Sequence, residues 1–258
     1  MRRIKLYFIT YKNNAELRET LKSVPKSGIK NYDYEINIVN NSPSMPIDFE
    51  IKELDNVRII ENQTRPEFST GHLSRNWNEC LIDGFRSLKN PDCDLVVLCQ
   101  NDLEFNSDVF DKIVEKHNDY DFISYGAGDA YHSYTVDAVR KVGLWDERFC
   151  AIGCHEGDYF LRNVIANPER SSINDSHHGR VHKPLDFEIL DLVAVYPTNR
   201  RFKEGEEIAR EHSKWGWFMH EVYRSKWPDP ARNWKKNVED TIMKNPQPIL
   251  YPYFELEK

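Results

Sequence analysis

The sequence lacks any apolar run long enough to cross a membrane. A spanning helix needs about 20 predominantly apolar residues, whereas compact runs such as Leu95 to Cys99 have the length of a β-strand. The basic residues Arg2 and Arg3 precede only a short apolar stretch, Leu6 to Ile9, which is typical of a first strand rather than a signal peptide. We therefore expect no transmembrane segment, while contact with a membrane surface stays open.

An excess of positive charge is also missing. The chain carries 35 Lys and Arg against 42 Asp and Glu, a formal net charge of −7, which argues against nucleic acid as a partner because nucleic-acid binders carry basic surfaces. The five cysteines are odd in number, which favours free thiols and a reducing compartment over a disulfide framework. We therefore expect a cytoplasmic protein.

Glycine and proline are scarce, at 11 and 13 of 258 residues, which excludes fibrous and low-complexity chains. Short apolar runs rich in β-formers alternate instead with helical patterns. This alternation predicts an α/β fold with a mostly parallel central sheet and helices on both faces. The predicted strands are 4–10, 35–40, 57–61, 94–99, 121–125 and 190–196. The predicted helices begin near 14, 73, 107 (with Ser107 as N-cap), 135, 158 and 206, and the polar stretch 171–184 is predicted to be a loop.

Polar side chains follow each of the predicted strands in the first half of the chain. Ligands of open α/β sheets bind beyond the carboxyl ends of the strands. Asp102 ends a hydrophobic strand and is therefore suited to hold a divalent cation against a phosphate, although a simple turn role is equally open. The strand-end segments are Thr10–Tyr11, Asn40–Ser42, Asn62–Gln63 and Gln100–Asp102.

An ordered set of segments carries a family resemblance. The segments are IKLYFITYKN, YEINIVNNSP, VRIIENQ, SRNWNECLIDG, DLVVLCQNDLEF, VDAVRKVGLWDERF, GCHEGDYFLRNV and VYRSKWP. The set resembles glycosyltransferases with the Rossmann-like GT-A fold, most similar to family 2, over roughly the first 180 residues and loosely beyond. The resemblance implies transfer of a sugar from a nucleotide-sugar donor to a hydroxyl of a glycan or other acceptor.

The character of the sequence changes beyond Tyr196, and we expect the chain to divide near that point. Residues 1–198 would form the catalytic domain, with a nucleotide-sugar half to about residue 102 and an acceptor half over 103–198. Residues 199–258 would form a C-terminal appendage, a helix and a proline-punctuated tail packed on the same domain. The segment 199–203 between these two parts is too short and too charged to mark a boundary between separate domains.

The segment QND is similar to the family's Asp-x-Asp motif, so Asp102 would bind Mn²⁺ or Mg²⁺ between the donor phosphates. Gln100 departs from the first acid of that motif, and Asn41 stands where the family often has an aspartate that touches the nucleoside. These departures remove two negative charges and leave metal dependence open. The nucleotide-sugar-binding residues implied by the resemblance are Thr10, Tyr11, Asn41, Arg75, Asn76, Gln100, Asn101 and Asp102.

The segments GLWDERF and HEGDYFLR are similar to the family's vGgFDerf and EDxDlxxR stretches, in which a carboxylate is the general base. A carboxylate at the start of a helix is suited to take the proton of an attacking hydroxyl, and such a base favours an inverting reaction. Asp158 and Arg162 match the final Asp and Arg of the family's stretch, whereas Glu156 lies one place nearer than usual and Gly157 replaces an acid. We therefore favour Asp158 slightly over Glu156. Charge matched to the helix dipole is the structural alternative for both residues.

Two further groups stand out. His177 and His178 resemble the histidine that often provides a third metal ligand after the acidic helix, and a solvated loop is the alternative. We interpret the aromatic residues of the last helix, among them Trp215, Trp217 and Trp227, as packing residues, with stacking on sugar rings open for one or two.

Two other functions stay open. A sugar-1-phosphate nucleotidyltransferase has a similar sheet, but the loop after the first strand lacks the glycines that such enzymes usually carry there. A catalytically weakened sugar- or nucleotide-binding protein of the same fold is favoured by Gln100, Asn41 and Gly157, which stand where acids are frequent. The sequence does not specify the donor sugar, the acceptor or the oligomeric state.

Overall fold

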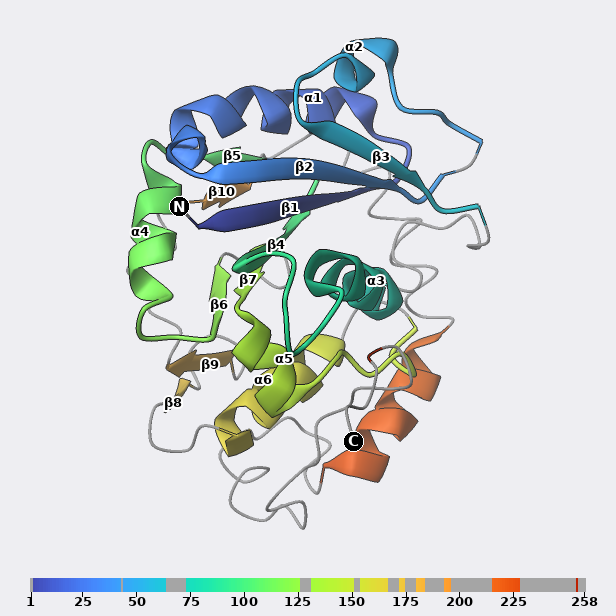
Figure 1. The fold of residues 1–258 in the computed structure, drawn as a ribbon. Coiled ribbons are helices and arrows are strands. Elements are labelled where there is room, and N and C mark those ends of the chain that lie inside the picture. Colours follow the sequence, from blue (N-terminus) through green and yellow to red (C-terminus); the bar gives the residue numbers. More distant parts are fainter. Residues whose placement is uncertain are drawn as a thin grey trace.

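A computed structural model of the chain describes residues 2–42, 44–63, 73–125, 131–150, 154–166, 172–174, 180–183, 193–195, 215–227 and 254. Its centre is a six-stranded sheet in the order β3-β2-β1-β4-β7-β6 (Figure 1). The first four strands in this order are parallel neighbours, whereas β7 is antiparallel to both β4 and β6. The strands are β1 (Arg3–Thr10), β2 (Asp33–Asn40), β3 (Val57–Glu61), β4 (Leu95–Gln100), β6 (Phe122–Tyr125) and β7 (Tyr131–Tyr134). The α/β class with a mostly parallel sheet is confirmed.

Helices cover both faces of this sheet, as predicted (Figure 1). Side chains along a strand alternate between faces, so Leu6 and Phe8 of β1 join one apolar core while Tyr7 and Ile9 join the other. The first core includes side chains of α1 (Asn14–Ser23), α2 (Phe49–Lys52) and α4 (Val109–Lys116). The second core includes side chains of α3 (Leu73–Phe85), α5 (Val136–Val142) and α6 (His155–Ala166). A strand buried on both sides reads as a continuous apolar run, which is why β1 and β4 were detectable in the sequence.

Two small antiparallel pairs and two short 3-10 helices lie outside the central sheet. The predicted loop over 171–184 is wrong in part, because β8 (Ser172–Asn174) pairs with β9 (Arg180–Lys183). These strands are too short and polar to produce a hydrophobic alternation. The strand β5 (Leu103–Phe105) pairs with β10 (Val193–Val195), which lies inside the predicted strand 190–196. The 3-10 helices are Val24–Ser27 and Ile29–Asn31.

Helix starts differ from the prediction at two places. Helix α4 has Asp108 as its N-cap, not Ser107, and Asp108 adopts a left-handed φ of 57°, a conformation that aspartate tolerates better than most residues. Helix α6 begins at His155 rather than at Asp158. Glu156 and Asp158 therefore both lie in the first turn of the helix.

The C-terminal part of the chain contributes a helix over residues 215–226. Val222, Tyr223 and Trp227 are buried in the same core as α3 and α6, so the packing interpretation holds for Trp227. Trp215 and Trp217 are 39% and 64% exposed, so packing buries them only in part. Within the described residues, no helix combines the length and the hydrophobicity that a bilayer crossing requires.

Candidate functional site

The carboxyl ends of the four parallel strands meet in a network of amide and hydroxyl groups. The buried Asn41, which follows β2, donates through Nδ2 to Oδ1 of Asn76 at 2.7 Å. Its own Oδ1 accepts from Nδ2 of Asn62, which follows β3, at 3.1 Å. Across the next strand pair, Nδ2 of Asn101 donates to Oγ1 of Thr10 at 3.2 Å. We call these five residues the amide edge, and they form a neutral polar network, mostly buried, at the edge of the sheet where ligands of α/β proteins bind.

Asp102 lies directly beside the amide edge, in the turn between β4 and β5. The aspartate is 3% exposed, while Gln100 and Asn101 are partly buried. The turn role considered for Asp102 is thus observed, and this role is compatible with metal binding, because the turn brings a carboxylate to the strand ends. The structure therefore places Thr10, Asn41, Asn76, Asn101 and Asp102 at one edge of the sheet.

The described residues contain no group of three or more His, Cys, Asp and Glu side chains arranged to hold a metal ion. Magnesium-type sites at nucleotide phosphates use one or two carboxylates and take their remaining ligands from phosphates and water. Asp102, with the amide oxygens of its neighbours, fits this kind of site and does not fit a cage made of protein ligands alone. His177 and His178 lie outside the described residues.

The other predicted donor residues flank the amide edge. Arg75 precedes Asn76 on α3, and its side chain is 49% exposed, with an ion pair to Glu79 at 3.3 Å one turn along the helix. Tyr11 follows Thr10 directly and is partly exposed, and Nζ of Lys12 lies 5.1 Å from the centroid of its ring. Both Arg75 and Tyr11 can therefore change partners at little cost, because exposed ion pairs and cation–π contacts are weak.

Helix α3 connects the amide edge to the start of α6. Trp77, the residue after Asn76, lies with its ring centroid 5.2 Å from that of the buried His155, the first residue of α6. Trp77 also contacts Trp145 at 4.5 Å between centroids. Glu156 follows His155 and is half-buried. One helix thus contacts both the strand ends and the acidic helix start.

A second contact fixes α3 against the GLWDERF segment. The side-chain oxygen of Asn78 accepts from the backbone N–H of Trp145 at 2.8 Å. Its Nδ2 donates to the carbonyl oxygen of Trp145 at 2.9 Å and to Oε1 of Glu147 at 3.0 Å. The buried amide satisfies both backbone groups of Trp145, so this segment is held in register with α3.

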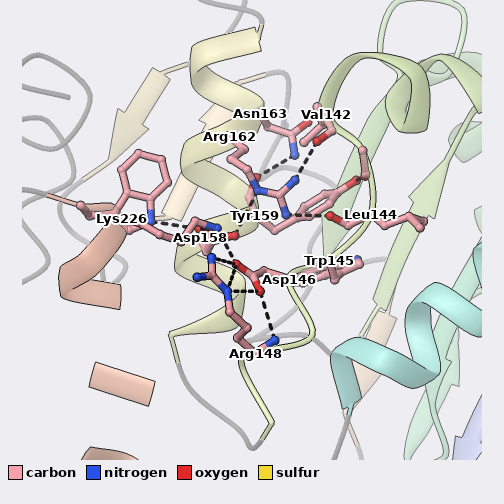
Figure 2. A network of polar contacts seen from close by, with 12 residues as sticks. Val142, Leu144, Trp145, Asp146, Arg148, Asp158, Tyr159, Arg162, Asn163 and Lys226 are labelled. Carbon is pink, nitrogen blue, oxygen red and sulfur yellow. Dashed lines mark hydrogen bonds and ion pairs between the residues drawn. The ribbon is translucent and has the colours of Figure 1, made fainter. Parts of the chain in front are cut away.

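Asp158 has a different environment from Glu156 (Figure 2). It is fully buried, and its Oδ1 accepts from Nε1 of Trp227 at 3.0 Å and pairs with Nζ of Lys226 at 2.5 Å. Its Oδ2 accepts from Nε of Arg162 at 3.0 Å. Arg162 also donates to the carbonyl oxygens of Val142 and Leu144 at 2.7 and 2.9 Å. Both oxygens of Asp158 are thus engaged in a network that joins α6 to the end of α5 and to the C-terminal helix.

Asp146 extends this network through Lys226 (Figure 2). Nζ of Lys226 lies 2.9 Å from Oδ2 of Asp146, and Nη2 of Arg148 lies 2.6 Å from the same oxygen. Burial opposes the ionisation of Asp146, but the hydrogen bond from Arg148 and the charge of Lys226 outweigh it and hold the pKa of this carboxyl well below its usual range. We call Asp146, Asp158, Arg162 and Lys226 the charged clamp.

Sequence reasoning missed several residues on which the site depends. Trp77 and Asn78 lie in the segment SRNWNECLIDG that carried the resemblance, but their contacts with His155 and Trp145 join segments distant in the chain. Lys226 lies in VYRSKWP, and nothing in the local sequence indicates that it would pair with two carboxylates. Such contacts depend on tertiary packing and leave no periodic signal.

Comparisons with known proteins give likenesses in structure alone. No protein-family model and no curated protein matches the sequence. Residues 1–349 of TarS from S. aureus align with 64% of this chain over 56% of their own length, at 11% identity and a TM-score of 0.46. The mannosyltransferase PcManGT from Pyrobaculum calidifontis, in complex with GDP-Man and Mn²⁺, aligns with 62% of this chain over 52% of its own, at 10% identity and a TM-score of 0.44.

GalNAc-T7 with UDP, GalNAc and Mn²⁺ aligns with 62% of this chain over 40% of its own, at 11% identity and a TM-score of 0.48. This chain therefore spans about half the length of the structures it resembles. Identities and TM-scores at this level leave the activity of the chain to be argued from its own residues.

Proposed function

We propose that the chain is a glycosyltransferase of the GT-A type that binds a nucleotide-sugar at the amide edge and transfers the sugar to an acceptor hydroxyl. The observation that carries the proposal is the double contact of α3. Asn76 accepts a hydrogen bond from Asn41 at the strand ends, and Trp77 packs on His155 at the acidic start of α6. A donor-binding surface and a carboxylate are thereby held by one rigid element, as a group transfer between two substrates requires.

The proposed donor site uses neutral groups for recognition and charged groups for the phosphates. Asparagine amides both donate and accept, so Asn41 and Asn101 suit the base, ribose or sugar hydroxyls. Arg75 is exposed beside them and suits a phosphate. Mn²⁺ or Mg²⁺, held by Asp102, would neutralise charge on the leaving nucleoside diphosphate when bound. Thr10, Tyr11, Asn76 and Gln100 complete the proposed donor-binding set.

We propose Glu156, rather than Asp158, as the general base. A base must reach the acceptor hydroxyl in order to take up its proton. Asp158 is buried, and its two oxygens contact Arg162, Trp227 and Lys226. Glu156 is half-buried on the first turn of α6. The geometry therefore favours a structural role for Asp158 and reverses the preference that the sequence gives.

The proposed function is tested first by a thermal-shift screen against UDP-, GDP-, dTDP- and CMP-sugars, each with Mn²⁺, Mg²⁺ or EDTA. A ligand that binds the native state raises its apparent stability by an amount set by its concentration relative to Kd. We expect a metal-dependent shift with the sugars of one nucleotide. Binding followed by neither transfer nor donor hydrolysis would favour the catalytically weakened binding protein instead.

The two carboxylates of α6 are separated by a pair of variants. We expect Glu156→Gln to reduce transfer by about 10²-fold or more, a typical effect of removing a general base, with donor binding and unfolding free energy unchanged. We expect Asp158→Asn to lower the unfolding free energy, because it weakens a buried ionic network. Full transfer by Glu156→Gln, measured with the donor that the screen identifies, would remove Glu156 from the mechanism.

A further inference from the structure

The turn that carries Asp102 is held from both sides by the hydroxyl of one buried threonine. Thr20 lies on α1 and is completely buried. Its Oγ1 donates to the carbonyl oxygen of Asn101 at 2.9 Å and accepts from the backbone N–H of Leu103 at 3.1 Å. The hydroxyl therefore joins the backbone groups immediately before and after Asp102.

The side chain of Asn101 ties the same turn to the end of β1. Its Nδ2 donates to Oγ1 of Thr10 at 3.2 Å and to the carbonyl oxygen of Asn13 at 3.4 Å. The backbone of the turn is thus hydrogen-bonded to Thr20 of α1, and the Asn101 side chain is hydrogen-bonded to Thr10 at the end of β1. With three of its neighbouring groups held, the backbone at Asp102 has little freedom to rotate.

A serine one turn further along α1 makes similar contacts at another place. Oγ of Ser23 accepts from the backbone N–H of Phe105 at 2.9 Å and donates to the carbonyl oxygen of Thr20 at 2.7 Å. Ser23 therefore also ties α1 to β5, two residues beyond the groups that Thr20 contacts. The two hydroxyls differ in one respect, because the contacts of Thr20 flank Asp102 and those of Ser23 lie beyond it.

We propose that Thr20 is a positioning residue, whose hydroxyl sets the direction of the Asp102 carboxylate toward a metal-bound nucleoside diphosphate. The inference rests on the proposed function. It deepens that function by naming a residue that contacts neither the donor nor the metal. Removing a group that hydrogen-bonds to a metal ligand without contacting the metal typically lowers metal affinity by about 10- to 100-fold. Thr20 acts on the backbone of the ligand rather than on its side chain.

The test compares Thr20→Val, Thr20→Ser and Ser23→Ala with the wild type. Valine keeps the branched shape and a similar helix propensity and replaces the hydroxyl with a methyl group. Serine keeps the hydroxyl, and Ser23→Ala removes the neighbouring hydrogen bonds. The dissociation constants of UDP, GDP, dTDP and CMP are measured by calorimetry with Mn²⁺ and with EDTA. Urea unfolding shows whether each variant is folded.

We expect Thr20→Val to raise the Mn²⁺-dependent dissociation constant about tenfold or more, with the EDTA value unchanged. Thr20→Ser and Ser23→Ala should change it by less than about twofold. Equal effects of Thr20→Val and Ser23→Ala would overturn the role of Thr20 and leave the proposed function standing. Failure of the wild type to bind any of the four nucleotides would overturn the proposed function and, with it, this inference.

Hydrogen exchange provides a readout that does not require Thr20→Val to fold. In the wild type, Mn²⁺ with the bound nucleotide should slow exchange of the Leu103 amide more than that of the Phe105 amide, because coupling between the ligand and the Thr20 contact is reciprocal. Thr20→Ser should behave like the wild type. Equal slowing of both amides would contradict the inference.

Discussion

The amide edge and the charged clamp are both buried polar networks, but they are built from opposite chemistry. The edge consists of neutral amides and a hydroxyl, with Asn41 as a shared partner of Asn62 and Asn76. The clamp consists of ions, with Lys226 between Asp146 and Asp158. Neutral groups can exchange one hydrogen-bond partner for another at little cost, whereas a buried ion that loses its partner is strongly destabilising. The comparison supports the proposal that a ligand binds at the edge, where partners can be exchanged, while the clamp maintains the structure.

The largest expected effect is the loss of the cation of the clamp. The side chain of Lys226 is only 10% exposed. Lys226→Met leaves the buried carboxylates of Asp146 and Asp158 without their shared partner. We expect the unfolding free energy, measured by urea denaturation, to fall by about 3–5 kcal/mol. Nucleotide binding by the folded fraction should not change, because none of the clamp residues belongs to the proposed donor-binding set.

The matched control for this variant is Arg224→Met on the same helix. Arg224 pairs with Glu221 at 2.7 Å, but both side chains are more than half exposed. The control should change the unfolding free energy by less than about 0.5 kcal/mol. Similar effects of the two substitutions would contradict the view that the clamp is a buried ionic network.

The unfolding free energy should fall with decreasing pH in two separate pH ranges. Burial lowers the pKa of His117 to about 4, against the opposite effect of its hydrogen bond with the Tyr120 carbonyl. The unfolded imidazole takes up a proton near pH 6.5 and the folded one does not, so stability falls as the pH drops from about 6.5 to 4. The loss from this one group is about 3 kcal/mol. His117→Asn should abolish this loss between pH 6.5 and 4, as measured by the pH profile of the unfolding free energy.

The clamp should respond in the more acidic window. Because the pKa of Asp146 is held low in the folded state, its contribution is complete above the unfolded value of about 3.9 and is lost as the pH falls below it. Asp146→Asn should flatten the profile below pH 4 and leave the loss between pH 6.5 and 4 in place. An unchanged slope below pH 4 would show that folding does not lower the pKa of Asp146.

The smallest expected effect on stability comes from Arg75, beside the amide edge. Its ion pair with Glu79 is exposed, so Arg75→Ala should change the unfolding free energy by less than about 0.5 kcal/mol. If Arg75 binds a donor phosphate, the same substitution should weaken nucleotide binding about tenfold, or about 1.4 kcal/mol. Arg86→Ala, an exposed arginine just after α3, serves as the control and should leave binding unchanged.

Strands with an apolar sequence could be predicted from the sequence, whereas a buried strand with a polar sequence could not. The sheet was predictable because β1, β2 and β4 are buried on both faces and read as apolar runs. The strand β7 was missed because its sequence YHSY looks polar, although all four side chains are buried. In the structure, the hydroxyl of Ser133 bonds to His117, a contact that no local pattern reveals.

The candidate site was predictable where it depends on strand ends and not where it depends on packing. Thr10, Asn41 and Asn101 follow apolar strands, and the structure joins them across the sheet. The choice between Glu156 and Asp158 could not be made from spacing, because both lie in one helical turn. Two of the partners that engage Asp158, Trp227 and Lys226, lie about 70 residues away in the chain.

The central claim is that the amide edge with Asp102 binds a nucleotide through a divalent metal, and Asp102→Asn tests it most directly. Asparagine keeps the shape of the side chain and removes its charge. Binding of UDP, GDP, dTDP and CMP is measured by calorimetry in Mn²⁺ and in EDTA for the wild type and for the variant. We expect the wild type to bind one of these nucleotides at least tenfold more tightly with Mn²⁺, and the variant to lose this difference while remaining folded. Equal affinity in Mn²⁺ and EDTA for both proteins would contradict the claim.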